Sequence, residues 1–573
     1  MKLTGTAVSG GIAIAPAFVY RPFTPEAKEA YLEADAADAA FAAFERHRSA
    51  VGAELLAICE SFSECDSDKA DILRAHIEIL DDIAIAEEVE RRIRSEHMDC
   101  LYAIETTFTL FGDMMASLDD PVLKERAADV MDVKYRLLCS CLGVPRATLK
   151  DVREPSIICA HDLLPSDTAT LNRAMVAGIV TETGGVTSHS AIIARSYGIP
   201  AVLGVEHAMD AVSGGDMLIL DASAGDVVVR PTPEELTLYT GQKATYDAHL
   251  ETIRSFTDAV PVSTDGERIL VCQNIGSADR EELKNAPFVD GVGLFRTEFL
   301  YMQGSQLPDE ETQYRAYKTV AETFGTRQVI VRTLDIGGDK TLDCLPLPKE
   351  DNPFLGIRAL RLCFARPELF RTQIRAILRA SVYGSLAMMF PMVGTIDDIR
   401  RARTVVEDVK SELRAGGIPF NEQIPVGIMI EIPAIAILAD AAAEEVDFAS
   451  IGTNDLCQYM LAVDRLNPEA APYYQFYNPA VFHVIKHTAD AFKSAGKPLS
   501  VCGEMAGDPR IAAVLVGMGI HKLSMSFSSV PAVKRVITGI SGKQAATLAQ
   551  EILRMSTASE IEAHLRAALD ALC

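Results

Sequence analysis

Eight short apolar runs, spread over residues 261–573, constrain the fold of this chain more than any other feature. In order they are RILVCQNI, VDGVGLF, QVIVRTL, LAMMFPMV, PVGIMIEI, DFASIGT, PLSVCGE and IHKLSMS, with helix-like segments between them. Strands that alternate with helices are typical of parallel sheets, and eight of them match a (β/α)₈ barrel. An open doubly wound sheet has the same alternation, so the spacing alone leaves that alternative open.

Residues with reactive side chains follow these runs, which favours the barrel. Six of them lie at or directly after the carboxyl ends of the runs: Arg296, Arg332, Glu431, Asn454, Asp455 and Cys502. A barrel brings the carboxyl ends of all its strands to one mouth. We therefore expect a barrel over residues 261–573 with a functional site at that mouth.

Two carboxylates in this set indicate a metal. Glu431 ends the run GIMIE, and Asp455 follows the next run in SIGTND. Mg²⁺ takes one or two protein carboxylates and fills its other positions with water and substrate oxygens. The alternative is that each carboxylate caps the helix that follows it. Together with the nearby arginines, the two carboxylates predict a Mg²⁺ site.

Three arginines indicate an anionic ligand. They are Arg296 in GLFRTEFL, Arg332 in VIVRTLDIGGDK and Arg465 in LAVDRLN. A guanidinium group binds phosphate or carboxylate through two hydrogen bonds and stays charged. Each arginine alone could equally be a salt-bridge partner. Beside a metal they suit a small, highly anionic substrate.

Cys502 and His189 each have two interpretations. Cys502, in SVCGEMAGDP, is either a small buried hydrophobic residue or a proton donor to a metal-bound anion. His189 lies in GGVTSHSAIIARSYG, where a glycine turn precedes a helix expected to begin near Ser188 or His189. A histidine there can accept a phosphoryl group beside free backbone N–H groups, or it can be a turn residue bonded to the backbone.

The first half of the chain predicts a helical domain inserted into an α/β domain. Residues 1–22 and 145–230 contain short apolar runs broken by Gly, Pro and Asp, which are strand and turn signals. Residues 23–144 are rich in Ala, Glu, Leu and Arg, with apolar residues at helical spacing. Residues 231–260 are polar and helix-prone, and we expect them to be a linker.

Charge and cysteine usage exclude several classes of function. A net charge of −26 argues against a nucleic-acid ligand and against an anionic membrane surface. The sequence contains no run of about 18 uncharged apolar residues, so we expect no membrane span. The twelve cysteines include no C-x-x-C pair, which indicates reduced thiols in a cytoplasmic protein.

Several long motifs resemble one known family. GGVTSHSAIIARS is similar to the phosphohistidine signature shared by Enzyme I and pyruvate phosphate dikinase. DNPFLGIRALR, VGIMIEIPAIAILAD, FASIGTNDLCQYMLAVDR and VCGEMAGDP are similar to barrel motifs of Enzyme I, in the same order. The chain therefore resembles Enzyme I of the bacterial phosphoenolpyruvate–sugar phosphotransferase system over essentially its full length.

The resemblance implies an architecture and partners. It implies a multidomain α/β protein: a swivelling phosphohistidine domain (1–22 and 145–230), an inserted helical domain (23–144), a linker (231–260) and a (β/α)₈ barrel (261–573). The barrel would bind phosphoenolpyruvate and form a homodimer. The helical domain would receive the small phosphocarrier protein HPr. The protein would be a Mg²⁺-dependent enzyme of the cytoplasm that releases pyruvate in the first step of sugar phosphotransfer.

The resemblance also implies a role for each site residue. His189 would be phosphorylated, with Thr168 near it, and Cys502 would protonate the enolate. The residues that would hold phosphoenolpyruvate are Arg296, Arg332, Asn454, Asp455 and Arg465, and the Mg²⁺ ligands would be Glu431 and Asp455. The chain departs from the family at Val186, where an arginine is usual. That departure concerns the lifetime of the phosphohistidine or the docking of its domain.

Two alternatives stay open. A pyruvate phosphate dikinase or phosphoenolpyruvate synthase has the same histidine and barrel, but it needs a large ATP-binding domain for which the residues before His189 leave no room. A catalytically weakened regulatory relative is the second alternative, and Val186 is its only support.

An acidic helical segment is a candidate docking surface for HPr. Residues 60–90 carry eleven Asp and Glu around Leu73, His76, Ile77 and Leu80 at helical spacing. An acidic rim around apolar contacts would steer a basic partner, although a charge run is more often a solvated helix face. We expect these four residues to form the apolar contacts, and Asp68 and Asp71 to belong to the rim.

Overall fold

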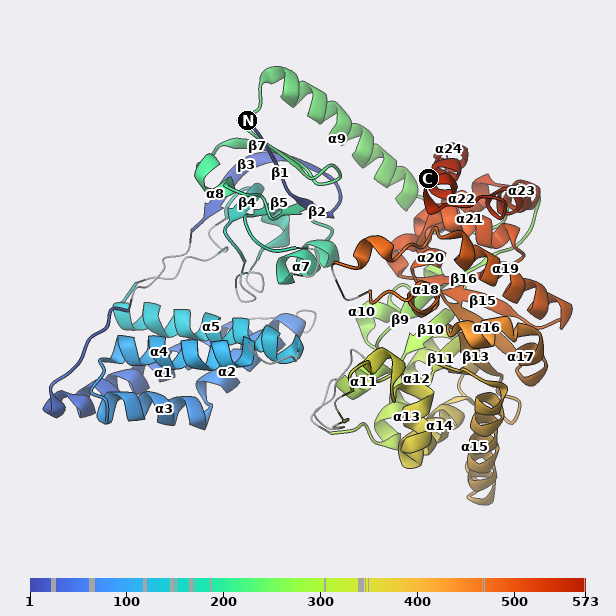
Figure 1. Ribbon diagram of the computed structural model, residues 1–573, viewed down its shortest axis with the longest axis horizontal. Helices are drawn as coiled ribbons and strands as arrows, with labels where there is room; N and C mark the ends of the chain where they lie inside the picture. The colour runs from blue at the N-terminus through green and yellow to red at the C-terminus, as the bar shows by residue number, and fades with distance from the viewer. Residues whose placement is uncertain are drawn as a thin grey trace. The chain divides into compact units, whose positions relative to one another are not determined.

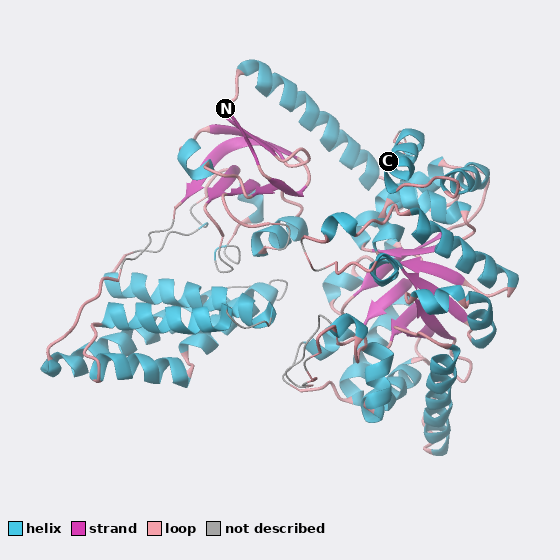
Figure 2. Cartoon of the chain, viewed as in Figure 1, coloured by secondary structure: helices cyan, strands magenta, loops and turns pink. Residues whose placement is uncertain are grey.

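In the computed structural model, eight parallel strands from the second half of the chain close into a barrel (Figures 1 and 2). The structure describes residues 1–21, 27–60, 67–116, 121–144, 152–163, 171–185, 188–302, 306–337, 350–465 and 469–570, with residues 149, 167, 345, 347, 348, 467 and 572. The chain divides into two units, Met1–His249 and Leu250–Cys573.

All eight apolar runs are strands of the barrel. Their bounds are β9 Leu270–Ile275, β10 Val292–Arg296, β11 Val329–Arg332, β12 Leu386–Phe390, β13 Val426–Ile430, β14 Phe448–Gly452, β15 Leu499–Cys502 and β16 Lys522–Met525. Each strand pairs in parallel with the next, and β16 pairs with β9. The closed ring confirms the barrel and excludes the open sheet.

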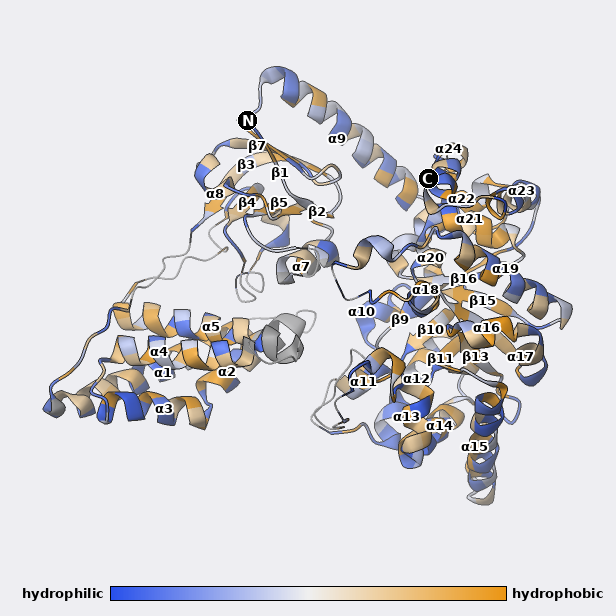
Figure 3. Cartoon of the chain, in the orientation of Figure 1, coloured by the Kyte–Doolittle hydropathy of each residue, from blue (hydrophilic) through white to orange (hydrophobic). Residues whose placement is uncertain are grey.

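The barrel strands are apolar on both faces because both faces are covered. Ile330 of β11 faces an inner cluster with Met389, Met429 and Phe448, whereas its neighbour Val331 packs in the outer core beneath the helices. Strands buried on both sides read as continuous hydrophobic runs instead of alternating ones. Figure 3 shows apolar residues gathered in these strands.

Helices surround the barrel, and several begin with a clear capping signal. Thr395 and Asp398 form a capping box at the start of α15. The helices are α10 Arg280–Leu283, α11 Glu298–Met302, α12 Glu310–Phe324, α13 Ala359–Ala365, α14 Pro367–Ala380, α15 Ile396–Ala415, α16 Pro433–Ile437, α17 Ala439–Glu445, α18 Thr453–Leu461, α19 Pro479–Ser494, α20 Glu504–Gly507, α21 Pro509–Gly517, α22 Val530–Gly539, α23 Gly542–Ile552 and α24 Ala558–Leu569.

The sheet of the first unit combines strands from before and after a helical segment. Its order is β1-β8-β7-β3-β4-β5-β6-β2, with β1 Lys2–Thr4, β2 Thr6–Ser9, β3 Ile12–Tyr20, β4 Ser156–Ala160, β5 Val176–Thr181, β6 Ala201–Leu203, β7 Met217–Asp221 and β8 Asp226–Val229. Strand β3 pairs in parallel with β4, so Phe18 lies opposite Ile158. The chain between β3 and β4 is therefore an insertion into this sheet, as expected.

The described part of the insertion is a bundle of five helices with its own core. They are α1 Ala37–Glu60, α2 Ser67–Leu80, α3 Ile83–Arg94, α4 Cys100–Ala116 and α5 Pro121–Leu142. Fully buried residues such as Leu55, Val89, Ile104 and Leu137 form that core. The multidomain α/β class is confirmed. The domain boundaries expected from the sequence stay a prediction.

The prediction of an apolar docking face on residues 60–90 is wrong. Leu73 and His76 are fully buried, and Leu80 is only 4% exposed, because these side chains face the bundle core. Ile77 packs against the same core and is only half-buried. The side chains of Asp68 and Asp71 lie outside the described residues. Helical spacing identified an apolar face correctly, but that face packs within the protein.

Helix α9, Pro233–Arg254, has no buried residue along its 22 positions. The division between the two units falls within it. A helix without a buried face depends on local propensity and side-chain pairs, such as Lys243 with Asp247 at 2.6 Å. No helix among the described residues is long and apolar enough to cross a membrane.

Gly517 is a test of the packing around the barrel. A Cβ atom at this position would collide with the backbone carbonyl of Ala545 in α23. We expect Gly517→Ala to destabilise the barrel unit by about 1–3 kcal/mol, because α21, which ends at Gly517, and α23 would have to separate. Gly241 of α9 has open space around its Cβ position, so Gly241→Ala should be neutral or slightly stabilising. Thermal unfolding of both variants would show this difference, and equal midpoints would contradict it.

Candidate active site

A cavity of about 210 Å³ lies at the carboxyl ends of the barrel strands. It collects the barrel residues that the sequence singled out. Its lining includes Arg296, Arg332, Glu431, Asn454, Asp455, Arg465 and Cys502, together with Glu298, Asp335, Met429 and Thr453. Their roles in chemistry stay a prediction, since geometry alone does not test them.

The strand ends explain why these residues meet. Arg296 and Arg332 are the last residues of β10 and β11, and they lie opposite each other in the strand register. Glu431 directly follows β13, and Cys502 ends β15. The barrel geometry therefore places guanidinium, carboxylate and thiol groups around one mouth.

Arg332 is held by carboxylates of the protein. It pairs with Glu298 and, at 2.9 Å, with Asp335. Burial works to lower the pKa of the Arg332 guanidinium, but Glu298 and Asp335 outweigh it and raise that pKa above its ordinary value. The side chain is 6% exposed, so its charge is fixed at the base of the cavity.

Arg358 is a buried residue of the site that no pattern in the sequence singled out as a functional group. It pairs with Asp335 at 2.8 Å and with Asp455 at 3.4 Å, and its side chain is 1% exposed. Burial opposes the charge, yet these two carboxylates raise the pKa of Arg358 above its ordinary value. Arg465 pairs with the other oxygen of Asp455 at 3.5 Å. Asp455 is thus oriented from two sides.

Three residues of this network were not predicted as site residues: Glu298, Asp335 and Arg358. Weak signals exist for each. Glu298 comes two residues after Arg296, Asp335 comes three residues after Arg332, and Arg358 lies in the motif GIRALR. None of these positions alone distinguishes a site residue from a surface charge.

Glu431 has the properties of a ligand for a cation. It is fully buried, and its Oε1 accepts a hydrogen bond from the Met392 backbone at 2.6 Å. Its Oε2 has no hydrogen-bond partner among the described residues. Burial, followed by repulsion from Asp455 and Asp335, raises the pKa of this carboxyl group. A cation next to Oε2 would relieve both costs.

The surroundings of Glu431 fit Mg²⁺. Gly452 faces its Oε2, and a Cβ atom there would lie only 2.8 Å from that oxygen. Glycine therefore keeps the space open. Among the described residues, no group of three or more His, Cys, Asp or Glu is arranged to hold a metal. A pair of carboxylates that leaves most positions to water and substrate is the arrangement that Mg²⁺ accepts.

Cys502 is a protonated thiol at the cavity wall. Its Sγ donates to the Ile451 carbonyl at 3.6 Å, and the residue is 1% exposed. Burial raises the pKa of this thiol to about 11. At neutral pH the side chain therefore carries a proton, and its role as a proton donor stays a prediction.

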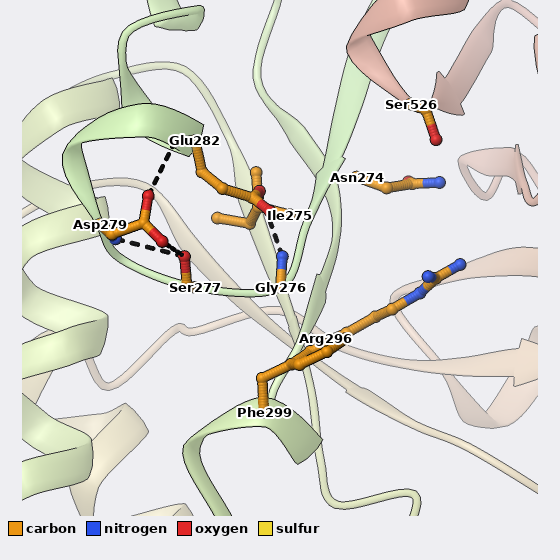
Figure 4. A pocket seen from close by; sticks show the side chains of 9 residues that line it. All are labelled: Asn274, Ile275, Gly276, Ser277, Asp279, Glu282, Arg296, Phe299 and Ser526. Atoms are coloured by element: carbon orange, nitrogen blue, oxygen red, sulfur yellow. Dashed lines mark hydrogen bonds between the residues drawn. The ribbon is translucent and has the colours of Figure 1, made fainter. Parts of the chain in front are cut away.

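Arg296 differs from Arg332, Arg358 and Arg465 because no described carboxylate forms a salt bridge with it. It lines the first cavity and also a neighbouring one of about 320 Å³ (Figure 4). In Figure 4 its guanidinium points toward the side where Asn274 and Ser526 lie, away from Asp279 and Glu282. Arg296 is half-buried, so its charge is available to a ligand.

His189 begins a helix in the first unit. Helix α7 runs over His189–Tyr197, and the Ser188 hydroxyl caps it by accepting from the Ala191 backbone at 3.3 Å. Gly184 has φ +93°, a conformation that favours glycine in the turn before the helix. The expected helix start is confirmed. The side chain of His189 lies outside the described residues, as do Val186, Thr187 and Thr168.

Comparisons with known proteins assign a family. The PEP-utilising enzyme families match three regions: the N-terminal domain over residues 4–126, the mobile domain over 152–225 and the PEP-binding domain over 251–541. Among solved structures, one titled as an NMR solution structure of Enzyme I is 36% identical and covers 43% of this chain and 99% of that chain, with a TM-score of 0.39.

Relatives that align with nearly the whole chain support the assignment to a family. A phosphoenolpyruvate-protein phosphotransferase of Bacillus sp. (strain S) is 44% identical over 97% of this chain and 96% of that protein. Proteins of the same name from Geobacillus stearothermophilus and Listeria innocua are 44% and 42% identical over 97% and 98% of this chain. Such identity over nearly equal lengths also argues against the dikinase alternative. The chain belongs to the phosphoenolpyruvate-protein phosphotransferase family.

Proposed function

We propose that this enzyme transfers the phosphoryl group of phosphoenolpyruvate to its own His189 and then to a histidine of HPr, releasing pyruvate. This is the first step of the sugar phosphotransferase system. One observation carries the proposal: a single cavity combines three guanidinium groups, four carboxylates and a protonated thiol. That set suits a small substrate with a phosphate, a carboxylate and a carbon that must gain a proton.

The arginines and Asn454 are proposed to hold the substrate. Arg332 is fixed by its carboxylates and presents a preorganised charge. Arg296 has no salt bridge with a described carboxylate, so an anionic group of the substrate supplies its partner. Asn454 is itself held, because its side-chain oxygen accepts from the Glu504 backbone at 3.0 Å. Preorganised groups of this kind stabilise developing charge without reorganisation.

Glu431 and Asp455 are proposed to hold Mg²⁺. The free Oε2 of Glu431 and the space beside Gly452 support this assignment. Bound Mg²⁺ would neutralise negative charge on the substrate oxygens. Arg358 and Arg465 keep the Asp455 carboxylate in one orientation, so this residue can act in both metal and substrate binding.

Cys502 is proposed to complete the reaction on the pyruvate side. The bond between phosphorus and the enol oxygen breaks as a His189 nitrogen bonds to phosphorus. The enolate that remains takes the Cys502 proton on carbon and becomes pyruvate, and the thiolate regains a proton from water. A thiol with a pKa of about 11 stays protonated until the enolate forms.

The partners and location are part of the same proposal. The helical insertion exposes Leu110 and Met114, one turn apart on α4, which supports a protein contact on this helix in place of the buried face expected earlier. Ile437 and Leu438, adjacent in the barrel unit, are 67% and 46% exposed, and this apolar pair supports a homodimer through the barrel. Free thiols among the described cysteines support a cytoplasmic location.

Incubation with phosphoenolpyruvate labelled on phosphorus tests the function directly. With Mg²⁺ present, the wild type should acquire one acid-labile, base-stable label in the peptide that contains His189. His189→Ala should lose all protein label but still bind phosphoenolpyruvate, because the cavity belongs to the other unit. Acid-labile label retained by His189→Ala would contradict the assignment of the acceptor. An unlabelled wild type would favour the regulatory alternative.

Glu431→Gln tests the metal site. It keeps the shape of the side chain but removes the charge, so we expect phosphorylation of His189 to slow by about 100-fold or more and the Mg²⁺ requirement to rise. Glu407 pairs with Lys410 outside the cavity at 2.9 Å, which makes Glu407→Gln a matched control with normal behaviour. The measurement is the labelling rate as a function of Mg²⁺ concentration. An unchanged Mg²⁺ dependence in Glu431→Gln would mean that the metal binds elsewhere.

Cys502→Ala tests the proton donor. Substrate affinity should stay within a few fold of the wild type, whereas pyruvate release should slow by about 10²–10⁴-fold. Cys363→Ala is the control, because Cys363 is equally buried but does not line the cavity. Calorimetric binding and single-turnover pyruvate formation separate the two effects. Equal losses of affinity and turnover would show that Cys502 serves packing.

A further inference from the structure

The loop that leads into helix α13 packs against the site through one aromatic side chain. This loop, residues 350–358, holds Phe354 beside two arginines. The centre of the Phe354 ring lies 5.5 Å from the guanidinium carbon of Arg358 and 6.0 Å from that of Arg465. A guanidinium group over the face of an aromatic ring is attracted to that face. One ring therefore supports both of the arginines that pair with Asp455.

The hydroxyl group of Tyr459 fastens this loop to helix α18. It donates a hydrogen bond to the Phe354 carbonyl at 2.6 Å, and it accepts one from Nη1 of Arg358 at 3.3 Å. Tyr459 follows Asp455 by four residues on α18, so the two side chains lie one turn apart on the same side of the helix. Nη1 of Arg358 also donates to Oδ1 of Asp455 at 3.4 Å. One guanidinium nitrogen thus connects the tyrosine hydroxyl with the carboxylate.

The loop relies on this attachment because the apolar residues at its tip face solvent. Leu355 is 64% exposed and Ile357 is 47% exposed, so neither side chain anchors the loop in the core. Without the Tyr459 hydroxyl, the Phe354 carbonyl would lose a short hydrogen bond to α18, and Nη1 of Arg358 would lose one of its acceptors. The aromatic ring and the guanidinium group beneath it would then be held less firmly.

We propose that Tyr459 is a positioning residue for Asp455. Its hydroxyl group holds the loop against α18, and the loop holds its aromatic ring over Arg358 and Arg465. These two arginines direct the two oxygens of the Asp455 carboxylate. Tyr459 is not among the described residues that line the cavity, so it acts on a ligand through Asp455 and not by contact. This role rests on the proposed function, in which Asp455 binds Mg²⁺ and the substrate.

Tyr459→Phe tests this role, because it removes the hydroxyl group and keeps the ring. The Mg²⁺ concentration that gives half-maximal labelling of His189 should rise about 3–10-fold, which is the effect of one lost hydrogen bond. The labelling rate at saturating Mg²⁺ should stay within about two-fold of the wild type, since bound metal restores the orientation of Asp455. Hydrogen–deuterium exchange, measured without substrate, should be faster over residues 350–358 in this variant.

Two further variants separate positioning from general stability. Tyr301→Phe is the control, because its buried hydroxyl donates to Gln313 at 3.1 Å outside the cavity. It should leave both the Mg²⁺ dependence and the exchange of residues 350–358 unchanged. Phe354→Leu removes the ring from the arginines but keeps the backbone carbonyl, and it should also raise the Mg²⁺ requirement. Combined with Tyr459→Phe, it should add less than its separate effect, because both changes act through one loop.

Three results would overturn the positioning role. The first is a Mg²⁺ dependence in Tyr459→Phe equal to that of the wild type. The second is a labelling rate reduced by the same factor at every Mg²⁺ concentration, which would show a loss of folded protein only. The third is unchanged exchange of residues 350–358. A wild type that acquires no label would instead contradict the proposed function, and the exchange measurement would still decide whether Tyr459 holds the loop.

Discussion

Charges withdrawn from water at the barrel mouth are the constraint on which this site depends. Arg332 and Arg358 are almost fully buried, and Asp335 lies between them within ion-pair distance of both. Taking such groups out of water costs several kcal/mol each, so every one of them requires its partners. Removal of one member would strongly destabilise the folded protein, because the remaining charge would stay buried and unpaired. The strand ends of the barrel hold these arginines and carboxylates close to one another. This pairing is what allows charged side chains to be buried in the barrel.

The network also divides the arginines into two kinds. Arg332 and Arg358 are satisfied by the protein itself and hold the shape of the site. Arg296 lines two cavities and forms no salt bridge with a described carboxylate, so its charge is open to a ligand. Glu431 is the acidic counterpart of Arg296, because one of its oxygens has no donor among the described residues. The groups without a protein partner are thus the ones that a metal and an anionic substrate would complete.

Much of this fold could be predicted because the barrel strands carry their signal locally. An apolar run bounded by turns indicates a strand wherever it is buried on both faces, and the residue at its end is then placed by the topology. Arg358 could not be predicted in the same way. Its partner Asp455 lies 97 residues further along the chain, and a distant pairing of this kind leaves no periodic pattern.

The helical insertion shows the converse limit. Helical spacing correctly grouped Leu73, His76 and Leu80 on one face of α2, but it cannot tell whether a neighbour within the protein or a partner covers that face. The fully buried side chains of Leu73 and His76 show that the bundle itself covers it. Spacing in sequence thus predicts faces, whereas the identity of what covers each face depends on the packing of all five helices.

Helix α9 has a consequence for how such a protein can change over evolutionary time. Because no side chain of α9 is buried, residues can be added to it or removed without disturbing the core of either unit. Each inserted residue lengthens an α-helix by about 1.5 Å and turns its end by about 100°. An insertion of seven residues would therefore lengthen the helix by about 10 Å while leaving its end rotated by only about 20° from its original direction. Selection can therefore change the length of α9 independently of the chemistry at the barrel mouth.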